Sequence, residues 1–340
     1  AEFTDHDAFI GPRATVDSIL DAPLSPSRLQ VLATCPFQFF QSQVLKIPKL
    51  EERKRGQWMS ALENGSLVHD ALSGFNREVM AGTTDARDSA ALEKLLVDAY
   101  KGFRKGNEPP SEFAWRAKLR ELVRVAKVVT GQEREIMTAE LGFGVAPWRT
   151  ESEADHTGDF SLKLGEVGLL LRGRIDVVER TARGIVVTDY KTGRSDQYNE
   201  QDLLDGGKRL QWVLYAYAYE ELTGEQVEES GYLFVSGDAA GQTAYGQPAS
   251  REEVGALLGA QFGLARRGAF GASVDPNGHC KWCDFRRVCG DLRQRRSEIA
   301  NKLDESLAGD PGGDGQAGAD PAAAFSGWTH AEKHIARRRK

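Results

Sequence analysis

The amino-acid sequence predicts an α/β fold with a helical N-terminal part and a cysteine-rich loop near its C-terminal end. Two observations predict this fold. Apolar residues recur at helical spacing through most of the first half, and from Glu140 onward short apolar and alternating runs indicate strands. With 340 residues and 40% hydrophobic composition, the chain can bury one large core, or one core and a smaller second one.

The first helix is expected to begin after Ser25, because serine is a favoured N-cap and Pro26 suits the first helical position. This helix runs towards Cys35 and Pro36. Apolar spacing predicts further helices over residues 62–79, 90–105 and 112–139, and a helical insertion spans about 80–139. Residues 1–23 lack strong periodicity and are expected to form an N-terminal extension.

The second half of the chain changes its period. Strands are predicted over residues 140–145, 160–164, 167–178, 184–190 and 230–236, with helices over 211–222 and 251–266. Residues 24–300 are therefore expected to form one domain. Residues 304–324 are rich in Gly, Ala, Asp and Pro and nearly free of large apolar side chains, so 301–340 is expected to be a flexible tail with a basic end.

The formal net charge of −6 argues against a uniformly basic surface for nucleic acid. Residues 101–127 still hold eight basic side chains against three acidic ones, which indicates either a positive helix face or a simply solvated one: Lys101, Arg104, Lys105, Arg116, Lys118, Arg120, Arg124 and Lys127. The sequence has no signal-like start and no apolar run of membrane length, so we expect a cytoplasmic location and no membrane partner.

Two carboxylates and a lysine occur on adjacent predicted strands. If residues 181–184 form a four-residue loop, Arg180 pairs with Ile185 and Asp176 falls opposite Asp189. Cross-strand neighbours lie about 5 Å apart, where two acids repel each other unless a cation lies between them. Lys191 follows Asp189 by two positions, so it shares the same strand face.

This group of side chains suits hydrolysis of a phosphodiester. Oxygen ligands favour Mg²⁺ or Mn²⁺, which would activate a water molecule and offset the charge of the phosphate. Lys191 would orient the water or stabilise the developing oxyanion. The alternative is an ordinary surface hairpin with alternating charges.

All four cysteines of the chain fit one pattern, in which Cys35 stands alone and Cys280, Cys283 and Cys289 form C-x2-C-x5-C. Disulfides are rare in the cytosol, so a metal is the better interpretation of two thiols three positions apart. Four cysteines can hold either zinc or a [4Fe–4S] cluster, and spacing alone does not separate the two.

The sequence resembles the PD-(D/E)XK nucleases, and among them the iron–sulfur nuclease domains of the RecB and AddB type. The resemblance covers residues 24–290, and the segments around Trp58–His69 and Cys35–Phe40 are most similar to AddB. It depends on ordered motifs: Leu24-Ser25-Pro26-Ser27-Arg28 before Cys35-Pro36-Phe37, Gly65-Ser66-Leu67-Val68-His69, Gly173-Arg174-Ile175-Asp176, Asp189-Tyr190-Lys191-Thr192-Gly193, Gln211 with Tyr215, and the cysteine triplet.

The resemblance implies a restriction-endonuclease-like core, a mixed central sheet flanked by helices, and a role for each matching residue. The implied Mg²⁺ or Mn²⁺ ligands are His69, Asp176, Asp189 and the backbone carbonyl of Tyr190, and Glu140 matches an acidic residue that lies near the metals in many relatives. Asp176, Asp189 and Lys191 are implied to be the catalytic residues. Support of the active site and contact with DNA are implied for Gln211, Tyr215 and Arg174. The four cysteines are implied to hold a [4Fe–4S] cluster that joins both ends of the domain, with structural zinc as the alternative.

The function implied is a DNA nuclease, an exonuclease on single-stranded ends, within a helicase-nuclease that processes double-strand breaks for recombinational repair. The sequence has no G-x-x-x-x-G-K-[ST] motif, so the implied helicase motor must be fused to it or be a partner subunit. Three alternatives stay open. They are a catalytically silent module that binds DNA ends, a standalone DNA exonuclease, and a zinc-stabilised enzyme that processes RNA.

Overall fold

A computed structural model of the chain describes residues 8–49, 58–131, 134–196, 198–275, 278–295 and 297–298. The fold is mixed α/β, as the sequence predicts. Its helices and strands, in chain order, are α1 (Ala14–Leu20), α2 (Pro26–Thr34), α3 (Pro36–Phe39), α4 (Ala61–Met80), α5 (Ser89–Arg104), α6 (Glu112–Thr130), β1 (Glu135–Phe143), β2 (Phe160–Leu164), β3 (Val167–Leu171), β4 (Gly173–Thr181), β5 (Gly184–Lys191), α7 (Gln211–Thr223), β6 (Val227–Phe234), β7 (Thr243–Gly246) and α8 (Arg251–Arg266).

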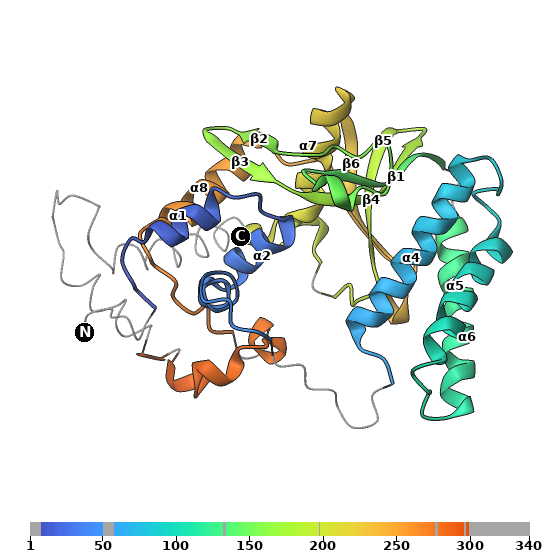
Figure 1. Ribbon diagram of the computed structural model, residues 1–340, viewed down its shortest axis with the longest axis horizontal. Coiled ribbons are helices and arrows are strands. Elements are labelled where there is room, and N and C mark those ends of the chain that lie inside the picture. The colour runs from blue at the N-terminus through green and yellow to red at the C-terminus, as the bar shows by residue number, and fades with distance from the viewer. Residues whose placement is uncertain are drawn as a thin grey trace.

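A five-stranded mixed sheet with the order β1-β4-β5-β6-β7 forms the centre of the molecule. Its β5–β6 pair is parallel and the other pairs are antiparallel, while β2 and β3 form a separate hairpin. Helices α4, α5 and α6 stand together beside the sheet, away from α1 and α2 (Figure 1). No helix in the described ranges is both long enough and apolar enough to cross a membrane.

Each face of the sheet buries its own core, because successive side chains of a strand point to opposite faces. On β5, Ile185 and Val187 pack with residues of α2, α7 and α8, whereas Tyr190 packs with α4, α5 and α6. On β6, Tyr232 joins the first core and Leu233 the second. The edge of the sheet where β4 begins and β5 ends therefore lies between two packed layers.

Helix α4 begins with a capping box, in which Glu63 N donates to Ser60 Oγ at 3.1 Å and Ser60 N donates to Glu63 Oε2 at 2.8 Å. Its apolar face, which includes Val68, Leu72 and Phe75, is fully buried against the second core. Burial of this face leaves the polar face of α4 directed away from that core.

Helix α2 begins as the sequence predicts, with Ser25 as N-cap, but it is not the first helix, because α1 lies within the predicted N-terminal extension and buries Val16 and Leu20. Helix α2 also caps another helix. The N-cap position of α7, Leu210, has no side-chain acceptor of its own. Gln30 of α2 supplies one, because its Oε1 accepts from Leu210 N at 2.8 Å and from Gln211 N at 3.0 Å. This bond fixes the start of α7 to α2.

The helix predicted over residues 112–139 is wrong at its end, because α6 stops at Thr130 and β1 already begins at Glu135. Ile136 and Ala139 are both buried, and their spacing of three also fits a helix. A register shift between Ile136 and Thr138 interrupts the alternation of inward and outward side chains, so the sequence pattern does not indicate a strand here. The segment is a strand because it pairs with β4.

The single strand predicted over residues 167–178 is also wrong, since it is two strands. Leu24 lies against this point, where Arg172 N donates to Leu24 O at 3.0 Å, and the chain passes there from the β2–β3 hairpin into the main sheet. The first residue of β4, Gly173, has to be glycine because a Cβ at this position would lie 2.5 Å from the Phe143 ring. The residues 301–340, predicted to form a tail, lie outside the described residues.

A buried ion pair supports the two strands that carry Asp176 and Asp189. Arg134 Nη1 lies 2.5 Å from Glu179 Oε1 and donates to Tyr190 Oη at 3.0 Å. The two charged side chains are 5% and 11% exposed, so each depends on the other for compensation of its charge.

Replacing Glu179 by glutamine is therefore expected to lower the free energy of unfolding by about 3 kcal/mol, because the Arg134 charge would stay buried without its partner. The matched control is Glu229→Gln, which breaks the exposed pair of Glu229 with Arg183 at 2.8 Å. That change should lower the free energy by less than about 1 kcal/mol. Urea denaturation of both variants measures the difference. Equal, small losses would contradict the structural role of Glu179.

Candidate active site

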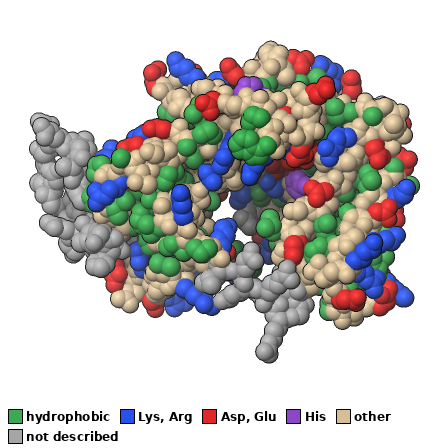
Figure 2. Space-filling view, viewed as in Figure 1, with side chains coloured by type: hydrophobic (Ala, Val, Ile, Leu, Met, Phe, Trp, Pro, Cys, Tyr) green, Lys and Arg blue, Asp and Glu red, His purple; other side chains and the backbone are tan. Residues whose placement is uncertain are grey.

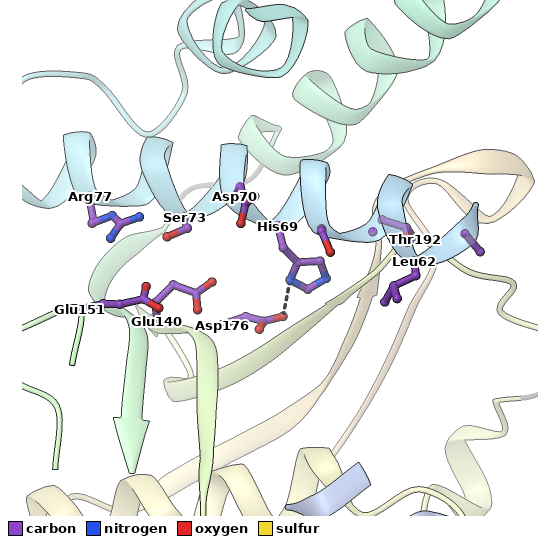
Figure 3. A pocket seen from close by; sticks show the side chains of 12 residues that line it. Leu62, His69, Asp70, Ser73, Arg77, Glu140, Glu151, Asp176 and Thr192 are labelled. Atoms are coloured by element: carbon purple, nitrogen blue, oxygen red, sulfur yellow. Dashed lines mark ion pairs between the residues drawn. The ribbon is translucent and has the colours of Figure 1, made fainter. Parts of the chain in front are cut away.

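The polar face of α4 forms one wall of a pocket. His69, Asp70, Ser73 and Arg77 line this pocket, together with Asp176 of β4 and Glu140 of β1. Figure 3 shows the imidazole of His69 directed from the helix towards the carboxylate of Asp176. Seen from outside, this face of the molecule is hollowed, with acidic side chains and a histidine on one side of the hollow and Lys and Arg side chains on another (Figure 2).

Asp176 is held by the strand next to it. The predicted β4–β5 register is confirmed, since Arg180 pairs with Ile185 and Val177 with Thr188. Beyond Val177 a side chain replaces the backbone as acceptor, because Asp176 Oδ2 accepts a hydrogen bond from Tyr190 N at 2.8 Å. The same oxygen lies 3.4 Å from His69 Nδ1, so one carboxylate connects α4 to β5.

Glu140 lies on the other side of Asp176. In the β1–β4 register, Ala139 pairs with Val177 and Leu141 with Ile175, which puts Glu140 opposite Asp176. The backbone of Glu140 has a φ of 52°, in the left-handed region that non-glycine residues rarely adopt. Arg174 Nη1 donates to the carbonyl of Glu140 at 2.5 Å and fixes this strained backbone. Such strain persists only where surrounding bonds maintain it, and it is common at functional sites.

Three side chains from three elements thus form a group suited to a cation. One ligand atom each from His69, Glu140 and Asp176 lies within 4.8 Å of the other two. Burial lowers the pKa of His69, but the hydrogen bond and charge of Asp176 outweigh burial and raise this pKa to about 9. Burial and the Asp176 charge raise the pKa of Glu140 to about 7. The raised pKa values of His69 and Glu140 both reflect nearby negative charge, which a bound divalent cation would offset.

Asp189 lies outside this group of three and holds the lysine. Its side chain is buried, and its Oδ2 lies 2.5 Å from Lys191 Nζ, which confirms that both side chains share one face of β5. Burial and the charge of Asp176 raise the pKa of Asp189 to about 6 although Lys191 opposes the rise. The sequence predicts that Asp189 faces Asp176 across a metal, but in the structure its carboxylate is directed to Lys191.

A line of hydrogen bonds continues from Lys191 into helix α7. Lys191 Nζ donates to Gln211 Oε1 at 2.9 Å, and Gln211 Nε2 donates to Tyr215 Oη at 3.3 Å. The predicted shared face of Gln211 and Tyr215 is confirmed by this contact. Lys191 also lies over the ring of Tyr232 at 5.2 Å, so its ammonium is fixed from three directions.

Arg174 lies behind the pocket. Its guanidinium bonds to both oxygens of Asp155, at 3.3 and 3.0 Å, and to the Glu140 carbonyl. Asp155 in turn accepts from Gly142 N at 2.8 Å and from Glu151 N at 2.9 Å. Arg174 therefore fixes the backbone of Glu140, which fits the supporting role that the resemblance implies, and both that role and DNA contact by Arg174 stay predictions.

Sequence reasoning missed three residues that shape the site. Gln30 caps α7 and so positions Gln211, Asp155 anchors Arg174, and Arg134 holds the ring of Tyr190. No local motif marks any of them, because each acts across 19 to 181 positions of sequence. The backbone carbonyl of Tyr190 stays a predicted ligand, and the structure adds that its N–H holds Asp176.

The four cysteines line a second, small cavity. Cys35 follows the end of α2, Cys280 lies in the 3₁₀ turn His279–Trp282, Cys283 directly follows that turn, and Cys289 ends the 3₁₀ turn Arg286–Cys289. All four are free thiols. Burial raises the pKa of the Cys35 thiol to about 12, and the nearby sulfurs of Cys289 and Cys283 add to this rise. Thiols in this state need a bound cation to become thiolates.

The basic residues predicted over 101–127 do not form one free positive face. Lys118 pairs with Glu121 at 2.6 Å, Arg104 lies over the Trp115 ring at 4.8 Å, and Arg116 pairs with Glu112 at 3.7 Å. These contacts favour the interpretation as a largely solvated helix surface with internal ion pairs.

Comparison with known proteins gives one finding about the family. A model of the PD-(D/E)XK nuclease superfamily matches residues 23–290, which is most of the chain and includes both groups of residues described above. No curated protein matches the sequence significantly.

Proposed function

This chain belongs to the PD-(D/E)XK nuclease superfamily, and we propose that it is a metal-dependent DNA nuclease that acts on single-stranded ends. Membership indicates a nuclease, that is, a phosphodiester hydrolase. The observation that carries the proposal is the convergence of His69, Glu140 and Asp176 in one pocket, beside a lysine that a buried carboxylate holds in place.

The residues fit a divalent cation. Two carboxylates and one imidazole are ligands that Mn²⁺ and Mg²⁺ accept, and burial together with the charge of Asp176 raises the pKa of Glu140. His69, Glu140 and Asp176 would hold the cation, and Asp189 is the adjacent carboxylate that could add to them. A bound divalent cation lowers the pKa of a water molecule and offsets charge on the phosphate.

The other groups of the site would position the reactants. Lys191 directly precedes Thr192, which lines the pocket, and its ammonium is already fixed by Asp189 and Gln211, so it would lose little freedom when a phosphate binds. Its positive charge would stabilise the oxyanion that develops during hydrolysis, and it could orient the attacking water. Hydrogen bonds to Tyr215 and Gln30 fix the position of Gln211, and Gln211 in turn orients the Lys191 side chain.

Replacing Lys191 by alanine or methionine is expected to slow Mg²⁺-dependent cleavage of end-labelled single-stranded DNA by about a hundredfold or more, because a preorganised cation beside the phosphate is lost. Methionine fills a similar volume, so it separates loss of charge from loss of packing. The matched control is Lys163→Ala, which removes an exposed lysine of β2 outside the pocket and should cleave like the wild type.

Cleavage at the wild-type rate by a folded Lys191→Met protein would contradict the role of the lysine. A folded wild type that binds Mn²⁺ and DNA but cuts neither single-stranded DNA nor RNA would instead support the alternative of a silent end-binding module. Cleavage of RNA in preference to DNA would support the RNA-processing alternative.

We further propose that the four cysteines hold a [4Fe–4S] cluster. The resemblance to iron–sulfur nuclease domains supports the cluster, and four free cysteines that line one small cavity fit its Cys₄ ligation. Cys35 and Cys280 are 245 positions apart, so a link between them restricts the unfolded chain by about 5 kcal/mol in a simple loop-closure estimate.

Replacing Cys35 by serine is expected to remove the iron and its visible absorption and to lower the melting temperature, because the link between the two ends of the domain is lost. Mn²⁺ affinity at His69, measured on folded protein below the melting point, should stay within about twofold of the wild type. Iron analysis, absorption spectra and calorimetry measure these changes. Zinc in place of iron in the wild type, or unchanged iron and melting in the variant, would contradict the proposal.

We propose that the biological setting is the processing of double-strand breaks by a helicase-nuclease. The support is the ordered similarity to RecB-type and AddB-type motifs. This sequence has no P-loop motif, so in that setting the motor would be fused to the chain or be a partner subunit. A standalone exonuclease of the same family would show full activity without any motor protein.

A further inference from the structure

Ser73 and Arg77 line the pocket but belong neither to the proposed metal ligands nor to the contacts of Lys191. Ser73 and Arg77 follow His69 at intervals of four residues, so the three lie along one face of α4. All three line the same pocket, and Figure 3 shows Ser73 and Arg77 directed to the same side of the helix as His69.

Ser73 has an unused hydroxyl at a buried position. Its side chain is only 6% exposed, and its Oγ has no hydrogen-bond partner. A hydroxyl in a helix usually bonds to the carbonyl four residues earlier when it has no other acceptor. A buried polar group without a partner is unfavourable, so this hydroxyl is suited to a ligand that enters the pocket.

Arg77 offers a charge at the end of the same face. Its side chain is exposed, and within the described part of the chain its guanidinium takes part in no ion pair. The nearby carboxylate of Glu151, which also lines the pocket, lies 3.8 Å from Arg174 Nη2. Arg77 therefore remains available to an anion, and its forked donors match two oxygens of a phosphate.

We propose that Ser73 and Arg77 form a subsite for a phosphate of the bound strand, a short distance from the phosphate that is cut. This inference depends on the proposed function, because it assumes that a strand lies in the pocket. Eight helical residues span about 12 Å from His69 to Arg77. A stacked strand rises about 3.4 Å per nucleotide, so the subsite would contact a phosphate at most three or four nucleotides from the metal group.

The strand would then run along α4, with its scissile phosphate at His69 and its flanking backbone at Ser73 and Arg77. The serine hydroxyl would donate to a phosphate oxygen, and the guanidinium would neutralise the phosphate charge. Such contacts fix register without reading base identity. The rival explanation for Arg77 is a favourable interaction of its charge with the C-terminal end of α4.

Binding of a fluorescent single-stranded oligonucleotide, measured by anisotropy with Ca²⁺ at several salt concentrations, tests the subsite. Arg77→Ala should weaken binding about tenfold at low salt and reduce the slope of log Kd against log salt by about 0.7, the value for one lost phosphate contact on a single strand. Ser73→Ala should weaken binding with an unchanged slope, because its contact is neutral. The matched control, Arg120→Ala, removes an exposed arginine of α6 outside the pocket and should change neither quantity.

Oligonucleotides with and without a 5′-terminal phosphate distinguish the source of the phosphate. A loss with both substrates assigns the subsite to an internal phosphodiester, and a loss only with the phosphorylated one assigns it to the strand end. If Arg77→Ala binds like Arg120→Ala while the wild type cleaves DNA, the subsite is overturned and the nuclease stands. If the folded wild type neither binds nor cleaves DNA, the proposed function itself fails.

Discussion

The site depends on holding several carboxylates close together beneath helix α4, although their negative charges repel one another. Glu140 and Asp176 face each other across β1 and β4, and Asp189 lies buried on the next strand. The raised pKa values of Glu140, about 7, and Asp189, about 6, have burial and the charge of Asp176 as their causes. The fold must offset this repulsion with stabilising contacts around the three carboxylates.

Three sets of interactions provide that stabilisation. Asp155 and Arg174 hold the left-handed backbone of Glu140, and the amide of Tyr190 fixes Asp176. The buried pair of Arg134 and Glu179 anchors the ring of Tyr190 in turn. The capped start of α7 directs Gln211 at the ammonium of Lys191. The supporting partners are not part of the pocket lining, so they hold the reacting side chains without filling the space that a ligand would occupy.

The parts of the site that follow a local period could be predicted from sequence. The register of β4 with β5 follows from the loop length and a period of two, which brought Asp176 and Asp189 to one place and Lys191 beside Asp189. The helical period likewise put Gln211 and Tyr215 on one face. Glu140 could be assigned only by resemblance, because a register shift and a positive φ angle determine its direction.

Other features needed the three-dimensional structure. The end of α6 at Thr130 was hidden because the spacing of Ile136 and Ala139 fits a helix as well as an irregular strand. Gln30 bonds to α7 across 180 positions, and no motif indicates that contact. The direction of the Asp189 carboxylate towards Lys191, rather than towards the group of three ligands, is set by burial and by the nearest cation.

Anomalous X-ray scattering from crystals grown with Mn²⁺ tests whether His69, Glu140 and Asp176 bind one divalent cation. We expect a single strong anomalous peak in the pocket, in contact with the His69 imidazole and with carboxylate oxygens of Glu140 and Asp176. Manganese bound elsewhere in the folded protein, or His69 and Asp176 still paired directly with no peak between them, would contradict this metal site.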